Sequence, residues 1–333
     1  MKSEWRHVPV VILAVFLGAA PGLSASDYEG YFERTLKVDG PVEMDIATDS
    51  GNIDVRSGEP GSVRVRGTIR VSRRVRPDVA ARKIQEIENN PPIEQTGNLI
   101  RVGYPKGMRR YVNIGDAWRH VSISYELIVP VETRWKSETG SGDQSVVGLK
   151  GPVKATTGSG NIRLSDVGDE TRVDTGSGDI ELRSVTGPVY ARTGSGNIRA
   201  SSIAGSIRAE TGSGDLRLEQ SSPHPASLET GSGTVELRGA QDSVRAQTGS
   251  GNIVIQGDPK GDWKLETGSG HVTLQVAPQA SFTLHARTRS GGIATNIPMT
   301  IQGKVGGSEL RGTVRNGGSL VDVRTGSGDI RIE

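Results

Sequence analysis

The sequence predicts an all-β protein, a two-sheet β-solenoid with about 18 residues per coil and an N-terminal strand and helix excursion that acts as a cap. Three observations predict it: a repeated phrase, a repeated apolar pattern and a polar ladder. The phrase Thr-Gly-Ser-Gly recurs at steps of 18 or 19 residues from Thr139 to Thr267, followed by steps of 21 and 37, and a period near 18 is typical of repeat architectures. Copies begin at Thr139, Thr157, Thr175, Thr193, Thr211, Thr230, Thr248, Thr267 and Thr325, with a variant at Thr288 and a relative at Thr48.

The apolar residues alternate within each half of a coil. Alternation indicates a strand with one face turned inward, so two such strands per coil predict two facing sheets. The coil that begins at Thr175 has its apolar residues at Ile180, Leu182, Val185, Val189 and Ala191, and the next coil has them at the same offsets. We expect the glycines to supply positive φ angles at the Thr-Gly-Ser-Gly edge, and Gly151, Gly187 and Gly205 to do so at the opposite edge.

The residue after the second glycine forms the polar ladder. Aspartate alternates there with asparagine, as in Asp143, Asn161 and Asp179. Stacked coils place equivalent residues about 4.8 Å apart, so the alternation keeps like charges roughly 10 Å from one another. This pattern supports coil-on-coil stacking independently of the period.

Residues 1–25 have the pattern of an export signal that is cleaved, with a basic start, an apolar run at 8–17 and a small-residue site at 23–25. An uncleaved anchor is the alternative, but the run is short for a membrane span, and we expect none in the mature chain. The chain has no cysteine, and its net charge of +2 does not favour nucleic acid as a partner. These features predict export to the periplasm or surface of a bacterium.

Residues 26–135 lack the tight period and are expected to hold the first coil and the cap. Strands are predicted at 63–71 and 121–129, and a hairpin at 93–102. A helix is predicted at about 77–90, between Pro77 and the Pro91-Pro92 pair. The excursion would cover backbone groups that the open end of the array leaves unpaired. The repeat solenoid is then expected to occupy residues 136–333.

The repeat offers several catalytic and metal-binding patterns, and we expect none of them to be a site. The repeated serines lack a base and an orienting group in one place, which a nucleophile needs. Asp143, Asp179 and Asp215 recur only in every second coil, too far apart to share a calcium ion. The apolar spacing does not fit a hexapeptide acyltransferase, and no carboxylate cluster for glycan cleavage is evident. No cofactor and no metal are expected.

Two basic features could bind a ligand. The first is an outward row at one offset, a candidate contact for an anionic polymer, although Asp174, Glu210, Glu229 and Glu266 lie close enough to pair with it. It comprises Lys154, Arg172, Tyr190, Arg208 and Arg245. The second is a basic-aromatic loop, for which packing onto the cap is the alternative. It contains Lys106, Arg109, Arg110, Tyr111 and Trp118.

The repeated Thr-Gly-Ser-Gly-Asp/Asn-Ile units, the export pattern, the early excursion and the Val129-Pro130 lead-in resemble the bacterial putative-adhesin family of exported β-solenoid proteins. The resemblance covers roughly residues 40–333 and implies the architecture, but brings no catalytic residues. We therefore expect a non-enzymatic envelope or surface protein that uses the solenoid as a binding or scaffold surface, with an envelope glycan or a protein as partner. The alternatives are an accessory factor in envelope stress or assembly that acts through a protein partner and, more weakly, a glycan-active enzyme.

Overall fold

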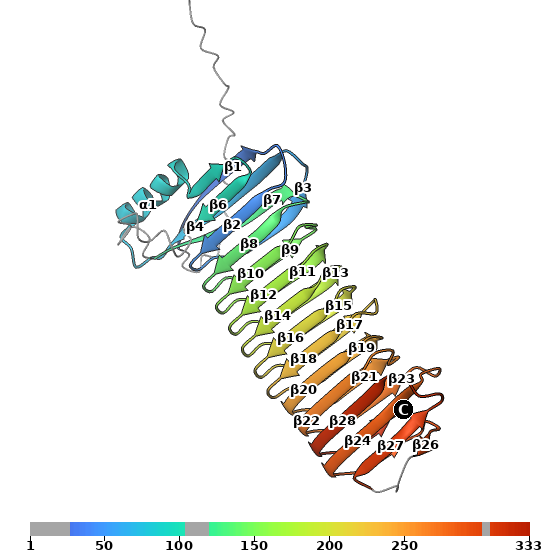
Figure 1. The fold of residues 1–333 in the computed structure, drawn as a ribbon. Helices are drawn as coiled ribbons and strands as arrows, with labels where there is room; N and C mark the ends of the chain where they lie inside the picture. Colours follow the sequence, from blue (N-terminus) through green and yellow to red (C-terminus); the bar gives the residue numbers. More distant parts are fainter. Residues whose placement is uncertain (1–26, 104–119, 302–306) are drawn as a thin grey trace, which may run out of the picture.

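The computed structural model describes residues 27–103, 120–301 and 307–333. They form a long rod of two facing sheets, as predicted (Figure 1). Sheet A has 14 strands in the order β1-β4-β7-β3-β9-β11-β13-β15-β17-β19-β21-β23-β29-β25. Sheet B has 15 strands in the order β26-β27-β24-β28-β22-β20-β18-β16-β14-β12-β10-β8-β2-β6-β5. Each regular coil contributes one strand to each sheet.

The regular coils run from β8 to β23 and pair in parallel with the equivalent residues of their neighbours. Their strands in sheet B are β8 (Arg134–Thr139), β10 (Val153–Thr157), β12 (Thr171–Thr175), β14 (Val189–Thr193), β16 (Ile207–Thr211), β18 (Ala226–Thr230), β20 (Val244–Ser250) and β22 (Trp263–Ser269). Those in sheet A are β9 (Gln144–Val147), β11 (Ile162–Val167), β13 (Ile180–Val185), β15 (Ile198–Ile203), β17 (Leu216–Gln220), β19 (Val235–Ala240), β21 (Ile253–Gly257) and β23 (Val272–Val276).

The inward side chains form a continuous core between the sheets. Ile180, Leu182 and Val185 are fully buried in one coil, and Val189 and Ala191 almost so. Trp135 and Trp263 occupy the same inward column in the first and last regular coils, and both are 1% exposed. Each apolar side chain removed from water contributes about 1.5–3 kcal/mol, which explains why short strands with few aromatic residues hold together.

The N-terminal excursion caps the rod, as predicted. Strands β1 (Tyr28–Lys37), β4 (Ser62–Val71) and β7 (Val121–Pro130) pair antiparallel at the end of sheet A. Helix α1 (Pro77–Asn89) begins with proline at its first turn and packs on β1 and β4 through Ala80, Ile84 and Ile87. The hairpin of β5 (Ile93–Thr96) and β6 (Leu99–Gly103) extends sheet B. Strands β2 (Glu43–Thr48) and β3 (Ile53–Gly58) form the first coil of the rod.

The expectation that these glycines supply positive φ angles was wrong. No Thr-Gly-Ser-Gly glycine between Thr139 and Gly270 has a left-handed φ, nor do those expected at the opposite edge, Gly151, Gly187 and Gly205. The coils instead approach so closely that a Cβ on Gly160 would overlap the carbonyl of Gly142 in the preceding coil. Glycine is required here by contact between backbones.

The left-handed corner lies at the end of the sheet A strands. Asp166, Ser184 and Ser202 occupy equivalent positions in successive coils with φ of 57°, 54° and 55°. Glycine occupies the related corners at Gly148 and Gly239, where φ is 77° and 74°. The corner therefore has the same backbone conformation in these coils, although aspartate, serine or glycine occupies it.

The C-terminal coils stack in a different order from the sequence. Strands β28 (Leu320–Ser327) and β29 (Ile330–Ile332) stack directly on β22 and β23. The earlier segment, β24 (Phe282–Ser290) and β25 (Ile293–Thr295), lies outside them. Strands β26 (Thr300–Ile301) and β27 (Glu309–Val314) then extend sheet B antiparallel to complete the end (Figure 1). The last coil of the sequence is thus inserted between two earlier ones.

Candidate functional site

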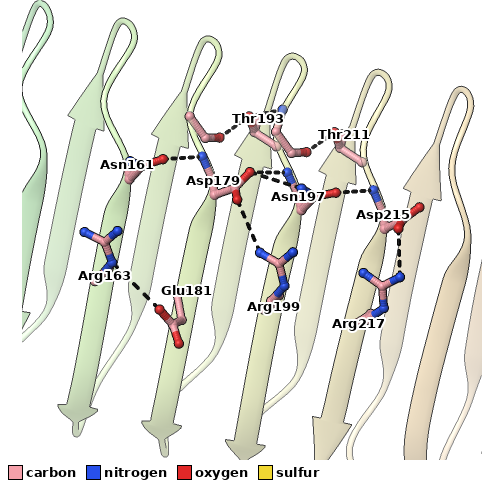
Figure 2. A network of polar contacts seen from close by, with 12 residues as sticks. Asn161, Arg163, Asp179, Glu181, Thr193, Asn197, Arg199, Thr211, Asp215 and Arg217 are labelled. Carbon is pink, nitrogen blue, oxygen red and sulfur yellow. Dashed lines mark hydrogen bonds and ion pairs between the residues drawn. The ribbon is translucent and has the colours of Figure 1, made fainter.

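The threonine of each Thr-Gly-Ser-Gly phrase is a buried structural group. The Thr193 hydroxyl donates to the Gly178 carbonyl of the preceding coil at 2.8 Å and accepts from the Gly196 N–H at 3.1 Å. The same donation recurs along the rod, from Thr139 to Thr325. Figure 2 shows it for Thr193 and Thr211. The serines of the phrase, such as Ser177 and Ser195, are exposed at the turn. The phrase therefore joins coils through its threonine.

Hydrogen bonds also join successive residues of the polar ladder. The Asn161 side-chain oxygen accepts from the Asp179 N–H at 2.9 Å, and Asp179 accepts from the Asn197 N–H at 2.8 Å (Figure 2). The Asn197 N–H, and then Arg199, lower the pKa of Asp179 because both stabilise the charged form. Each aspartate thus sits among donors that its neighbours supply, and alternation with asparagine adds spacing between charges.

The residues of the predicted polymer contact do form one row on the outer face of sheet B. Strand pairing places Lys154 beside Arg172, Arg172 beside Tyr190 and Tyr190 beside Arg208. Ser227 separates Arg208 from Arg245. Tyr190 is 44% exposed in the middle of the row.

The row is longer than the sequence reading proposed. Lys136 precedes Lys154, and Lys264 follows Arg245, both in register. The same offset in the sequence could have found both, because Lys136 lies 18 residues before Lys154 and Lys264 lies 19 after Arg245. We call these eight positions the basic row: Lys136, Lys154, Arg172, Tyr190, Arg208, Ser227, Arg245 and Lys264.

A second row lies two residues further along the same strands. It is mainly acidic, and we call it the acidic row: Glu138, Thr156, Asp174, Arg192, Glu210, Glu229, Gln247 and Glu266. Arg172 pairs with Asp174 at 3.3 Å, Arg208 with Glu210 at 2.6 Å and Lys264 with Glu266 at 3.3 Å. Burial raises the pKa of Glu266, but hydrogen bonds from Gln247 and Lys264 outweigh it and lower that pKa overall.

The outer face of sheet A is arranged differently. Its row mixes both signs, although Arg199 lies beside Arg217. Some of its ion pairs run between coils: Arg163 pairs with Glu181 at 3.8 Å (Figure 2), and Arg217 with Glu236 at 3.8 Å. Arg199 instead pairs with Asp179 of the ladder at 3.2 Å. Charges on sheet A therefore join one coil to the next.

A shallow hollow of about 390 Å³ lies where the cap meets the rod on sheet A. Asp54 and Glu126 line it on neighbouring strands, directly opposite each other, with Arg56 and Ser145 beside them. Burial, and then the Glu126 charge, raise the pKa of Asp54. Sequence reasoning missed this carboxylate pair, because 72 residues separate its members and no local motif links them.

The predicted basic-aromatic loop, with Lys106, Arg109, Arg110, Tyr111 and Trp118, lies outside the described residues. Among residues 27–103, 120–301 and 307–333, no helix has the length and apolar character needed to cross a bilayer. In the same parts of the chain, no group of three or more histidines or carboxylates is placed to hold a metal ion.

Comparison with known proteins identifies one family. The model of the Toastrack DUF4097 family matches residues 131–210 and 169–333. No curated protein matches the chain. Solved structures include a putative cell adhesion protein from Clostridium sporogenes, with 11% identity, a TM-score of 0.24, and coverage of 91% of this chain and 99% of that one. A putative adhesin from Bacteroides fragilis has 13% identity and a TM-score of 0.36, with coverage of 91% and 97%.

Proposed function

Because the chain belongs to the Toastrack DUF4097 family, whose model covers more than half of it, we propose that it is a non-enzymatic rod of the bacterial envelope or surface. The rod binds its partner through the outer face of sheet B. The ligand class that this face fits is an anionic envelope glycan, with Lys154, Arg172, Tyr190, Arg208 and Arg245 as its contacts. The export pattern of residues 1–25 supports delivery to that compartment.

The observation that carries this proposal is that the eight positions of the basic row include six basic residues and no acidic residue. Sheet A intersperses acidic residues with its arginines and gains ion pairs between coils, such as Arg163 with Glu181, whereas sheet B places Lys136, Lys154 and Arg172 side by side. Like charges directly opposite each other on neighbouring strands destabilise a sheet. The rod tolerates this repulsion over three successive coils, whereas sheet A pairs Arg163 with Glu181 and Arg217 with Glu236, which supports a role for the row in binding something outside the coil.

The chemistry of the row suits a carboxylated polymer. Arginine and lysine about 4.8 Å apart present a regular line of donors to successive carboxylates. Lys154 makes no hydrogen bond or ion pair with any described residue, so its charge is available to a ligand. The exposed Tyr190 ring adds an apolar platform between two arginines.

A triple substitution tests the proposal. Lys154→Gln, Arg172→Gln and Arg208→Gln together should abolish pull-down of acidic envelope glycans by the mature chain. The matched control is Arg183→Gln, Arg199→Gln and Arg217→Gln, which removes the same charge from sheet A and should leave binding intact. Equal binding by both variants and the wild type would refute the role of the basic row. A variant without residues 104–120 tests the loop in the same assay.

The carboxylate pair at the hollow gives the enzymatic alternative one specific observation. Opposed carboxylates, one with a raised pKa, are the groups that glycoside hydrolysis uses. Release of reducing ends from envelope glycans that is lost in Asp54→Asn and in Glu126→Gln would establish that alternative. Unchanged glycan in the presence of the wild type would dismiss it.

A further inference from the structure

We propose that the outer face of sheet B also binds a second copy of this chain, in a parallel dimer whose two-fold axis runs along the rod. The axis lies between the basic and acidic rows, so each basic row faces the partner's acidic row. The inference shares with the proposed function only the premise that this face is a binding face; it does not depend on a glycan.

The argument begins with the symmetry of the rows. They run parallel to the rod and two residues apart on every strand, roughly 7 Å. Rotation by 180° about a line midway between them exchanges the rows without changing the height of any coil. Rotation about an axis across the rod would instead place each basic row on the partner's basic row, where like charges repel. Charge therefore selects the parallel arrangement.

The residues brought together are compatible at every coil. The juxtaposed pairs, one member from each copy, are Lys136 with Glu138, Lys154 with Thr156, Arg172 with Asp174, Tyr190 with Arg192, Arg208 with Glu210, Ser227 with Glu229, Arg245 with Gln247 and Lys264 with Glu266. None joins like charges. The next coil continues the pattern, because Asp322 and Arg324 occupy the two rows in β28. Tyr190 and Arg192 add a cation–π contact across the axis.

The pairs within one chain leave room for these contacts. The side chains of Arg172 and Arg208 are 59% and 60% exposed although each is ion-paired, so donors on both remain open to a second carboxylate. Lys154 has no partner among the described residues and gains the Thr156 hydroxyl of the second copy. In the dimer, an ion pair of one chain, such as Arg172 with Asp174, would meet the same pair of the second copy and form a group of four charges.

The size of the face suits a reversible dimer. Eight coils at about 4.8 Å and strands of about five residues at 3.3 Å give roughly 600 Å² per copy. The total of about 1,200 Å² lies at the lower limit of specific interfaces. We therefore expect association in the micromolar range that weakens as salt rises.

Charge exchange between the rows tests the geometry. The basic-row variant carries Arg172→Glu and Arg208→Glu, and the acidic-row variant carries Asp174→Arg and Glu210→Arg. In sedimentation equilibrium at low salt, each alone should associate at least tenfold more weakly than the wild type. Mixed in equal amounts, they place opposite charges at all four contacts and should regain an affinity within about threefold of the wild type. If these charges only paired within one chain, mixing the two variants would not restore association.

The controls separate the face from net charge and from misfolding. Arg199→Glu with Arg217→Glu makes the same charge change on sheet A and should leave dimerisation unchanged. Thr156→Glu, at a half-exposed position, adds a carboxylate opposite the partner's Lys154 and should tighten association about threefold. A wild type that stays monomeric at millimolar concentration in low salt, or a mixture no tighter than its separate components, would overturn the inference.

Polygalacturonate distinguishes this inference from the glycan proposal. A polymer that binds the wild type and dissociates the dimer would show that both partners use the basic row. Dimerisation without polymer binding would refute the glycan proposal and leave the dimer standing. Polymer binding by a chain that remains monomeric would refute the dimer and leave the glycan proposal standing.

Discussion

Replacement of Thr193 by valine tests the role assigned to the repeated phrase. The side chain is 2% exposed, and valine has nearly the same shape without the hydroxyl. The substitution removes the bond to the Gly178 carbonyl and the bond from the Gly196 N–H. Both glycines are buried, so the N–H and the carbonyl lose partners that water cannot replace. An unsatisfied buried polar group costs about 1–3 kcal/mol, and we expect a loss of about 2–4 kcal/mol in the free energy of unfolding.

Replacement of Thr193 by serine is the matched control. It keeps the hydroxyl and deletes one methyl group, at a cost of about 1 kcal/mol. The expected order of stability is therefore threonine, then serine, then valine, whereas hydrophobicity alone would place valine first. Urea unfolding gives the free energies, and hydrogen exchange at the Gly196 amide reports the local effect, because repeat arrays can open coil by coil. A valine variant as stable as the wild type would refute the hydrogen-bond account of the phrase.

Other substitutions and one pair of truncations test the remaining features of the rod. Gly160→Ala should cost about 1–3 kcal/mol by overlap with the preceding coil, whereas the adjacent exposed Ser159→Ala should change stability by less than about 0.5 kcal/mol in the same urea assay. Ser184→Gly should stabilise by about 0.5 kcal/mol and Ser184→Val should destabilise, because φ is 54° there. The folded-state pKa of Asp179 is lowered, so its contribution is present above the unfolded value of 3.8 and lost as pH falls through the folded value. Asp179→Asn should lack that part of the acid loss in melts at pH 7 and pH 3. The last coil of the sequence stacks between β22 and β24, so deletion of residues 320–333 should leave residues 277–319 unsupported and sensitive to protease. Deletion of residues 277–333 should instead leave a resistant rod.

The sequence could predict whatever repeats. The period located the coils, and alternation identified inward residues such as Ile180 and Leu182, which are fully buried. Pro77 marked the helix start, and the observed helix is Pro77–Asn89. The offset of Lys154 and Arg172 predicted a shared row, which strand pairing confirms. In each case neighbouring coils impose the same environment on the same offset, so local pattern is enough.

What could not be predicted depends on contacts between distant segments. The 37-residue step from Thr288 to Thr325 reads as a missing copy, and nothing in either phrase says which coil stacks first on β22. The hollow joins Asp54 to Glu126 only through the pairing of β3 with β7. The glycine requirement was likewise hidden, because a tight turn and a close backbone approach leave the same residue in the sequence.

The two faces of the rod show how one repeat can carry two electrostatic designs. On sheet A, Arg163 and Glu181 lie at one offset in successive coils, so each pair adds to the contact between coils. On sheet B, Arg208 pairs with Glu210 of its own strand, and Glu210 also pairs with Arg192 of the preceding coil. The acidic partners there lie at another offset, so the eight positions of the basic row hold no acidic residue. Exposed pairs of either kind contribute at most about 1 kcal/mol, so both faces are affordable to a rod held by its core and its threonines. The difference lies in what each face offers to another molecule. Mixed signs at about 4.8 Å largely cancel within a few ångströms, whereas the basic row and the mainly acidic row extend over eight coils and can be matched only by a partner of comparable length. An extended polyanion matches one row, and a second copy of the chain matches both.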